Sequence, residues 1–138
     1  FDIGNFHADY YIKMENYIAN GNELTPKACF DKEQNLFSIS GRSIPENAID
    51  IYAPIIDWWQ QYLQNPNPET TIDMNFEYIN SSSMKQIARL IAMLDKVEKS
   101  KINIRWHYNS DDTDSKMQAE RLAKMVKFPI VLIADASK

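Results

Sequence analysis

The sequence is poor in cysteine, glycine and basic charge, and it holds no long hydrophobic run. Its single cysteine, Cys29, excludes an internal disulfide and any zinc site built on several cysteines. Three glycines among 138 residues are too few for the glycine-rich loops that bind nucleotide phosphates. A formal net charge of −4 provides no basic surface for a nucleic-acid backbone. We therefore expect no nucleic-acid partner and no bound cofactor.

The lack of a long apolar run also bears on where the protein works. No stretch reaches the roughly 20 apolar residues that a membrane-spanning helix needs, so we expect no membrane insertion. Nothing resembles a signal peptide, and a single cysteine is typical of a cytoplasmic protein. The sequence begins at Phe1 rather than at a methionine. Met14 is one candidate for the natural start, which would make residues 1–13 upstream or added sequence, and the alternative that they are native stays open.

What is present suits one soluble domain with a sizeable core, since 44% of the residues are hydrophobic and 25% are charged. Residues 1–22 are predicted to be an N-terminal extension, whose apolar positions fit one short helical face before the turn residues 20–22. Because termini are usually mobile, a loosely docked arm is favoured over a dedicated binding helix. The domain itself is predicted at 23–138, ordered from about Leu24.

Strand signals alternate with helix signals along this domain. Runs rich in β-prone residues predict strands at 28–31, 36–40, 71–79, 102–108 and 128–133. Apolar residues at three- and four-residue spacing predict helices at 48–63, from the serine-rich segment at 80–85 to about Lys99, and from 109–114 to about Val126. In the first helix Pro54 predicts a kink or a restart. Trp59 is expected to pack onto the sheet and Trp58 to stay partly exposed.

The resulting element order is β-β-α-β-α-β-α-β. Strands separated by helices imply parallel neighbours, so we predict an α/β fold. It should hold one mixed, mostly parallel sheet of about five strands, with three helices covering the sheet faces. Loops 41–47, 79–83 and 108–114 should meet at the edge where parallel strands end, which is the usual place for ligands and partners.

The segment Asn80-Ser81-Ser82-Ser83-Met84-Lys85 lies between a predicted strand and the clearest amphipathic helix of the chain. A serine at such a junction can cap the helix with its hydroxyl. The free backbone N–H groups at a helix start can also hold a phosphate group. The residues alone are compatible with plain capping and with phosphorylation.

Four motifs resemble the SiaC family of bacterial regulatory phosphoproteins, in the family's order and spacing from about Leu24 to Ile133. They are Thr25-Pro26, Gly41-Arg42-Ser43-Ile44-Pro45-Glu46-Asn47, Tyr78-Ile79 with the serine segment, and Trp106-His107-Tyr108 followed by acids. The resemblance implies a STAS-like fold and a switch protein that is not an enzyme. It also implies three partners: a kinase, a PP2C-type phosphatase, and a diguanylate cyclase that the unmodified form binds and activates. The implied output is control of cyclic-di-GMP signalling and biofilm formation.

By position in the family's motif, the implied phosphorylated residue is Ser81, which directly follows the asparagine. Serine replaces the family's usual threonine here, so Ser82 and Ser83 are chemically equivalent alternatives. They are expected to support Ser81, one of them as the helix cap. A second departure places Ile44 where the family usually has tyrosine, which could alter partner contact at that loop. The residues expected to contact partners are Pro45, Glu46, Asn47, Tyr78, Asn80, Ser82, Ser83, Lys85, His107, Asp111 and Asp112.

Other interpretations stay open beside the switch. The main alternative is a STAS-like module that binds a small ligand or acts structurally, with no phosphorylation and purely structural serines. A metal site from His107, Asp111, Asp112 and Asp114 is disfavoured, because acids at a helix start usually complement the helix dipole. A hydrolase built on Ser81, His107 and Asp111 lacks the G-x-S-x-G elbow.

Overall fold

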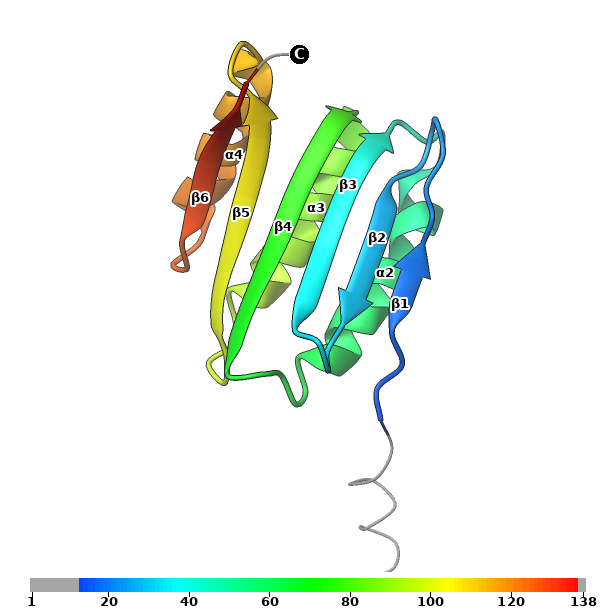
Figure 1. Ribbon diagram of the computed structural model, residues 1–138, viewed down its shortest axis with the longest axis vertical. Coiled ribbons are helices and arrows are strands. Elements are labelled where there is room, and N and C mark those ends of the chain that lie inside the picture. Colours follow the sequence, from blue (N-terminus) through cyan, green and yellow to red (C-terminus); the bar gives the residue numbers. More distant parts are fainter. Residues whose placement is uncertain (1–12, 137–138) are drawn as a thin grey trace, which may run out of the picture.

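The computed structural model describes residues 13–136, which form one six-stranded sheet and three helices (Figure 1). The strands are β1 (Tyr17–Ala19), β2 (Lys27–Asp31), β3 (Leu36–Ser43), β4 (Glu69–Ile79), β5 (Lys101–Asn109) and β6 (Ile130–Asp135). The helices are α2 (Ala48–Tyr62), α3 (Ser81–Leu94) and α4 (Thr113–Met125). The predicted α/β domain with three helices and a mixed sheet is confirmed, with six strands in place of about five.

The strands lie side by side in chain order, from β1 to β6. β1 and β3 run antiparallel to β2, whereas β3, β4, β5 and β6 are parallel to one another. Because each new parallel strand is added on the same side of the last, crossovers of one hand place every helix on the same face. Figure 1 shows α2, α3 and α4 together behind the sheet. The expectation that helices cover both faces was therefore wrong, and in residues 13–136 the other face is open.

The sixth strand is β1, which lies in the segment that we expected to be an extension. Tyr17 pairs with Phe30 of β2, and the two rings stack at 5.4 Å between centroids. Ile18 points the other way and is exposed. Residues 17–19, predicted to lie on a short helical face, thus form a strand. The part of that predicted face within residues 1–12 lies outside the described part of the chain. Three residues are too few for a periodicity signal, so the free edge of β2 decides their conformation.

The core lies between the sheet and the helices, and α2 supplies its largest side chains. Tyr52, Ile55, Ile56, Trp59 and Tyr62 follow helical spacing and are almost fully buried. The helix continues through Pro54, which lies on its exposed side. The prediction that Trp59 packs onto the sheet is confirmed.

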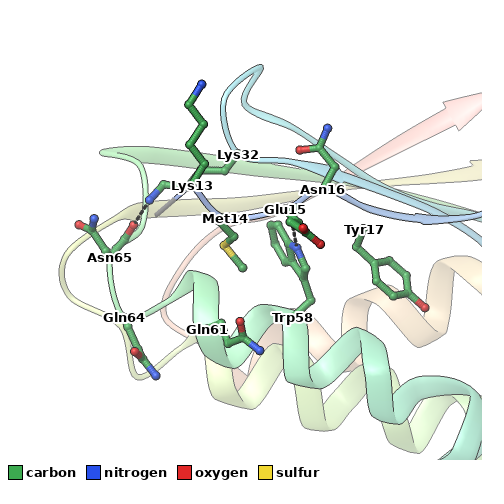
Figure 2. Close-up of a pocket in the computed structure, with 10 residues that line it drawn as sticks. All are labelled: Lys13, Met14, Glu15, Asn16, Tyr17, Lys32, Trp58, Gln61, Gln64 and Asn65. Atoms are coloured by element: carbon green, nitrogen blue, oxygen red, sulfur yellow. Dashed lines mark hydrogen bonds between the residues drawn. The ribbon is translucent and has the colours of Figure 1, made fainter. Parts of the chain in front are cut away.

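Trp58 is buried at 8% exposure, so the expectation of partial exposure was wrong. Figure 2 shows its indole beneath the segment that leads into β1, with Nε1 donating a hydrogen bond of 2.8 Å to the Glu15 carbonyl. Its ring also stacks on Tyr62 at 5.3 Å between centroids. A hollow of about 750 Å³ lies beside Trp58, between residues 13–17 and the end of α2. The segment before β1 is therefore what covers Trp58.

Within residues 13–136, none of the helices combines the length and the apolar character that crossing a membrane would take.

Candidate functional site

The parallel strands β3, β4, β5 and β6 all end at one edge of the sheet, which we call the carboxyl edge; their other ends form the amino edge. Figure 1 shows the carboxyl edge at the top of the molecule. The loop 44–47, Asn80 and the loop 110–112 follow β3, β4 and β5 at this edge. The prediction placed the candidate site here.

Asn80 joins the first two of these segments. Its backbone N–H donates to the Ser43 carbonyl at 2.9 Å, and its side-chain Nδ2 donates to the Pro45 carbonyl at 3.2 Å. Its Oδ1 accepts a hydrogen bond of 2.9 Å from the Ser83 backbone N–H, which makes Asn80 the N-cap of α3. The expectation that a serine caps this helix was wrong: asparagine and serine are equally good N-caps, and Asn80 is the residue with extended backbone at that place.

A buried hydroxyl chain lies beneath the start of α3. Ser43 Oγ donates to Ser83 Oγ at 2.8 Å, and it lies 2.7 Å from the hydroxyl oxygen of Tyr52. Since the one proton of Ser43 is used toward Ser83, the Tyr52 hydroxyl donates to Ser43. Burial raises the pKa of Tyr52 to about 12, against the opposing effect of its hydrogen bond to Ser43. This carboxyl-edge hydroxyl chain (Tyr52, Ser43, Ser83) ties α2, β3 and α3 together.

The three serines therefore have three different environments. Ser83 is fully buried in the hydroxyl chain. Ser82 is exposed, but its hydroxyl donates to Asn80 Oδ1 at 3.1 Å. Ser81 is exposed at the first position of α3, and within residues 13–136 its hydroxyl has no hydrogen-bond partner. Ser81 is thus the hydroxyl most accessible to another protein.

The remaining residues predicted to contact partners divide by exposure. Glu46, Asn47, Tyr78, Lys85 and Asp111 are exposed. Pro45, like Ser83, is buried, so neither offers its side chain to a partner in this conformation. Asn47 also caps α2 by accepting a hydrogen bond of 3.2 Å from the Asp50 backbone N–H.

The third loop, 110–112, is set apart from the serines. β4 and β5 pair only as far as Met74 and Trp106, and beyond this point a cleft of about 890 Å³ opens at the carboxyl edge. Glu77, Asn109, Asp112 and Asp135 are among the residues that line it. Asp112 caps α4 by accepting a hydrogen bond of 3.0 Å from the Ser115 backbone N–H.

His107 belongs to the open face of the sheet rather than to the serine site. Its Nε2 lies 3.0 Å from Asp73 Oδ1, and its Nδ1 lies 3.5 Å from Asp135 Oδ2. Both ring nitrogens therefore face carboxylates, and neither faces Ser81 as a hydrolase would require. Across residues 13–136 no group of three histidine, cysteine or acidic side chains is placed to hold a metal ion.

The loop 20–26, between β1 and β2, also reaches the carboxyl edge. Sequence reasoning used its Thr25-Pro26 as a family motif but did not place the loop at the candidate site. The Ile44 backbone N–H donates to the Leu24 carbonyl at 2.8 Å, which joins this loop to 44–47. The available signal was Asn20-Gly21-Asn22, which we interpreted only as the end of a helix. Gly21 has φ of +73°, and a Cβ there would lie 2.8 Å from the Lys27 nitrogen, so this turn requires glycine.

Comparison with known proteins supplies the family. The sequence matches the SiaC family of regulatory phosphoproteins over residues 19–135, which is most of the chain. The chain belongs to the SiaC family. The match begins at the last residue of β1 and ends at the last residue of β6.

Relatives of the SiaC family in Pseudomonas aeruginosa agree with this assignment. An uncharacterised protein of strain UCBPP-PA14 is 26% identical over 123 residues, which span 88% of this chain and 98% of the relative. The solved structure of SiaC from the same species has a TM-score of 0.80 at 25% identity, covering 88% of this chain and all of SiaC. In another solved structure SiaC is bound, as its activator, to the diguanylate cyclase SiaD; that SiaC has a TM-score of 0.80 at 24% identity, covering 86% of this chain and 99% of its own.

Proposed function

We propose that this SiaC-family protein is a cytoplasmic, non-enzymatic switch that is controlled by phosphorylation of Ser81. In the unmodified form it binds and activates a diguanylate cyclase. A dedicated kinase adds the phosphate and blocks this activation, and a PP2C-type phosphatase restores it. The output of the switch is control of cyclic-di-GMP signalling and biofilm formation.

The observation that carries the proposal is the environment of Ser81. Of the three serines, Ser81 is exposed and, within residues 13–136, has a hydroxyl without a hydrogen-bond partner. The helix start that carries it is held in place by the hydrogen bonds of Asn80 and by the carboxyl-edge hydroxyl chain. A kinase can reach such a hydroxyl without unfolding the helix. Phosphorylation of Ser82 would remove its hydrogen bond to the cap residue, and Ser83 is out of reach.

The position at a helix start explains how the domain would tolerate the phosphate. A phosphoserine carries about −1.5 to −2 charge at pH 7. The free N–H groups and the positive dipole end of α3 favour an anion at this place, so the fold can stay unchanged. A partner surface that buries the neutral hydroxyl would instead have to desolvate a dianion, which is costly. Release of the cyclase therefore requires no conformational change in the switch protein.

The test compares Ser81→Asp with Ser81→Ala in binding to the purified SiaD-type cyclase of the source bacterium. We expect Ser81→Ala to bind and activate the cyclase like the wild type, because alanine leaves the surface neutral. Ser81→Asp should lose binding by at least about tenfold, which corresponds to roughly 1.4 kcal/mol. Isothermal titration calorimetry measures the binding, and formation of cyclic-di-GMP measures the activation.

Ser82→Asp provides the matched control, because it places the same charge one residue further along α3 at an exposed position. Equal cyclase binding by Ser81→Asp and Ser81→Ala would sink the proposed mechanism. An equal loss in Ser81→Asp and Ser82→Asp would reduce the claim to a general effect of negative charge.

A second candidate, binding of a small ligand, is favoured by the cleft at the carboxyl edge. Its lining includes the carboxylates of Glu77, Asp112 and Asp135, which suit a cationic ligand better than an anionic one. A small molecule that co-purifies with unmodified protein from native cells would favour this candidate over the switch.

A further inference from the structure

Leu24 and Tyr78 are two of the large apolar side chains that are exposed at the carboxyl edge. Tyr78, three residues before Ser81, is 56% exposed at the end of β4. Leu24, in the loop 20–26, is 54% exposed beside the loop 44–47. Exposed apolar side chains at a functional edge carry meaning when their backbone is fixed, because an ordered anchor loses little entropy on binding.

The backbone around Leu24 is fixed by hydrogen bonds on both sides. Its N–H donates a hydrogen bond of 2.8 Å to Asn22 Oδ1, and its carbonyl accepts a hydrogen bond of 2.8 Å from the Ile44 N–H. Asn22 Oδ1 also accepts from the Thr25 N–H at 2.9 Å, and the Asn22 N–H donates to the Thr25 carbonyl at 3.0 Å. The loop thus presents the exposed Leu24 side chain from a backbone that hydrogen bonds fix on both sides.

Arg42 connects this loop to Tyr78. Its Nε donates to the Glu23 carbonyl at 2.9 Å, and its guanidinium carbon lies 4.6 Å from the centre of the Tyr78 ring. Its Nη1 lies 3.6 Å from Glu77 Oε1. A cation over the face of a tyrosine ring is attractive, so Arg42 orients Tyr78 and leaves the other face of the ring to a partner.

We propose that Leu24 and Tyr78 are paired anchors by which the unmodified protein binds its diguanylate cyclase, with Arg42 as the residue that positions them. The inference rests on the proposed function and adds the loop 20–26 to the binding surface. The partner surface that fits these anchors is an apolar recess. Its rim should be basic, because the charged residues of loops 20–26, 44–47 and 110–112 are all acidic, namely Glu23, Glu46, Asp111 and Asp112.

This arrangement also explains why a phosphate on Ser81 would strongly weaken binding of the cyclase. The strand order places Ser81, after β4, between the loops that follow β3 and β5. Ser81 follows Tyr78 by three residues at this edge, so a partner that covers the Tyr78 anchor would also have to accommodate a phosphate on Ser81. A dianion buried against apolar surface loses its hydration without gaining a partner.

The test replaces Leu24 and uses Leu36 as the matched control. Leu36 is a second exposed leucine, at 60% exposure, but it lies at the start of β3 and therefore at the amino edge. In calorimetric titrations of the purified SiaD-type cyclase from the source bacterium, Leu24→Ser should raise Kd by about 10-fold or more, as loss of an interface anchor does. Leu36→Ser should leave Kd within about twofold of wild type, since it changes an exposed surface residue outside the proposed interface. Thermal unfolding followed by circular dichroism checks that both variants fold.

Ser81→Asp in the same titrations separates this inference from the proposed function. If Ser81→Asp loses binding while Leu24→Ser binds like Leu36→Ser, the switch stands and the anchor inference is overturned. If Ser81→Asp binds as tightly as wild type, or if wild type does not bind, the proposed function falls and the anchors fall with it. A loss of binding in Leu24→Ser but not in Leu36→Ser supports the inference.

Discussion

The two edges of the sheet are built on the same buried polar arrangement, although the candidate site occupies only one of them. At the carboxyl edge it is the hydroxyl chain described above. At the amino edge the Tyr62 hydroxyl lies 2.7 Å from Thr70 Oγ1, which in turn lies 2.8 Å from Ser100 Oγ. Each chain starts from a tyrosine of α2 and joins it to the sheet. Since both edges have such a chain, the buried hydroxyls by themselves indicate structure rather than function.

What distinguishes the carboxyl edge is the helix start above its hydroxyl chain. α2, α3 and α4 all begin at the carboxyl edge, where free N–H groups face solvent, and they end at the amino edge. The C-terminal ends of the helices lie at the amino edge, and their negative dipole ends disfavour an anion. The hollow beside Trp58 also lies at this edge (Figure 2). An exposed hydroxyl at a helix start therefore separates the proposed phosphate site from the amino edge, where, within residues 13–136, a similar buried chain lies beneath no such hydroxyl.

The largest effects should come from removing the middle hydroxyl of each chain. Ser43→Ala and Thr70→Val each delete two buried hydrogen bonds and leave a partner unsatisfied, so each should lower the free energy of unfolding by about 2–3 kcal/mol. Urea denaturation at pH 7 measures both. The exposed Ser82→Ala is the control and should change stability by less than about 0.5 kcal/mol. A large loss of unfolding free energy in only one of the two variants would contradict the claim that the two hydroxyl chains are equivalent.

A smaller effect should appear at high pH and depend on Tyr52. Burial raises the pKa of Tyr52 to about 12 in the folded protein, above its ordinary value of 10.0. The folded state therefore favours the neutral phenol, and this contribution to stability is complete below pH 10.0 and is lost as the pH rises through about 12. Across this window the wild type should lose about 2 kcal/mol more than Tyr52→Phe, which has no proton to release.

Unfolding free energies measured at intervals from pH 9 to 12 would show this as a narrowing gap between the two proteins. Burial also raises the pKa of Tyr17, but this residue is present in both, so its effect cancels. A constant gap across the range would contradict the account of the Tyr52 environment.

The local parts of this fold could be predicted from the sequence. In α3, Ile87, Leu90, Ile91 and Leu94 recur at helical spacing, and all four are buried as that spacing predicts. The parts that failed depend on distant contacts. Burial of Trp58 depends on Glu15, which is 43 residues away, and the open sheet face depends on the order of all the strands.

The candidate site shows the same division. The three loops were predicted to share an edge from the element order, and the first two are joined as expected. Which serine is exposed depends on Ser43 and Asn80, whose contacts no sequence pattern specifies. The loop 20–26 was missed because its turn residues also end helices. The antiparallel pairing of β1 with β2 brings the loop to this edge, and hydrogen bonds with Ile44 and Arg42 hold it there.

The central claim is that the carboxyl edge carries a regulatory phosphate on Ser81. Intact-mass measurement of the protein from native cells, with fragment mapping, tests this most directly. We predict a gain of one phosphate that is located on Ser81, disappears in Ser81→Ala and persists in Ser82→Ala. A phosphate that persists in Ser81→Ala, or protein that stays unmodified in the presence of its kinase, would contradict the claim.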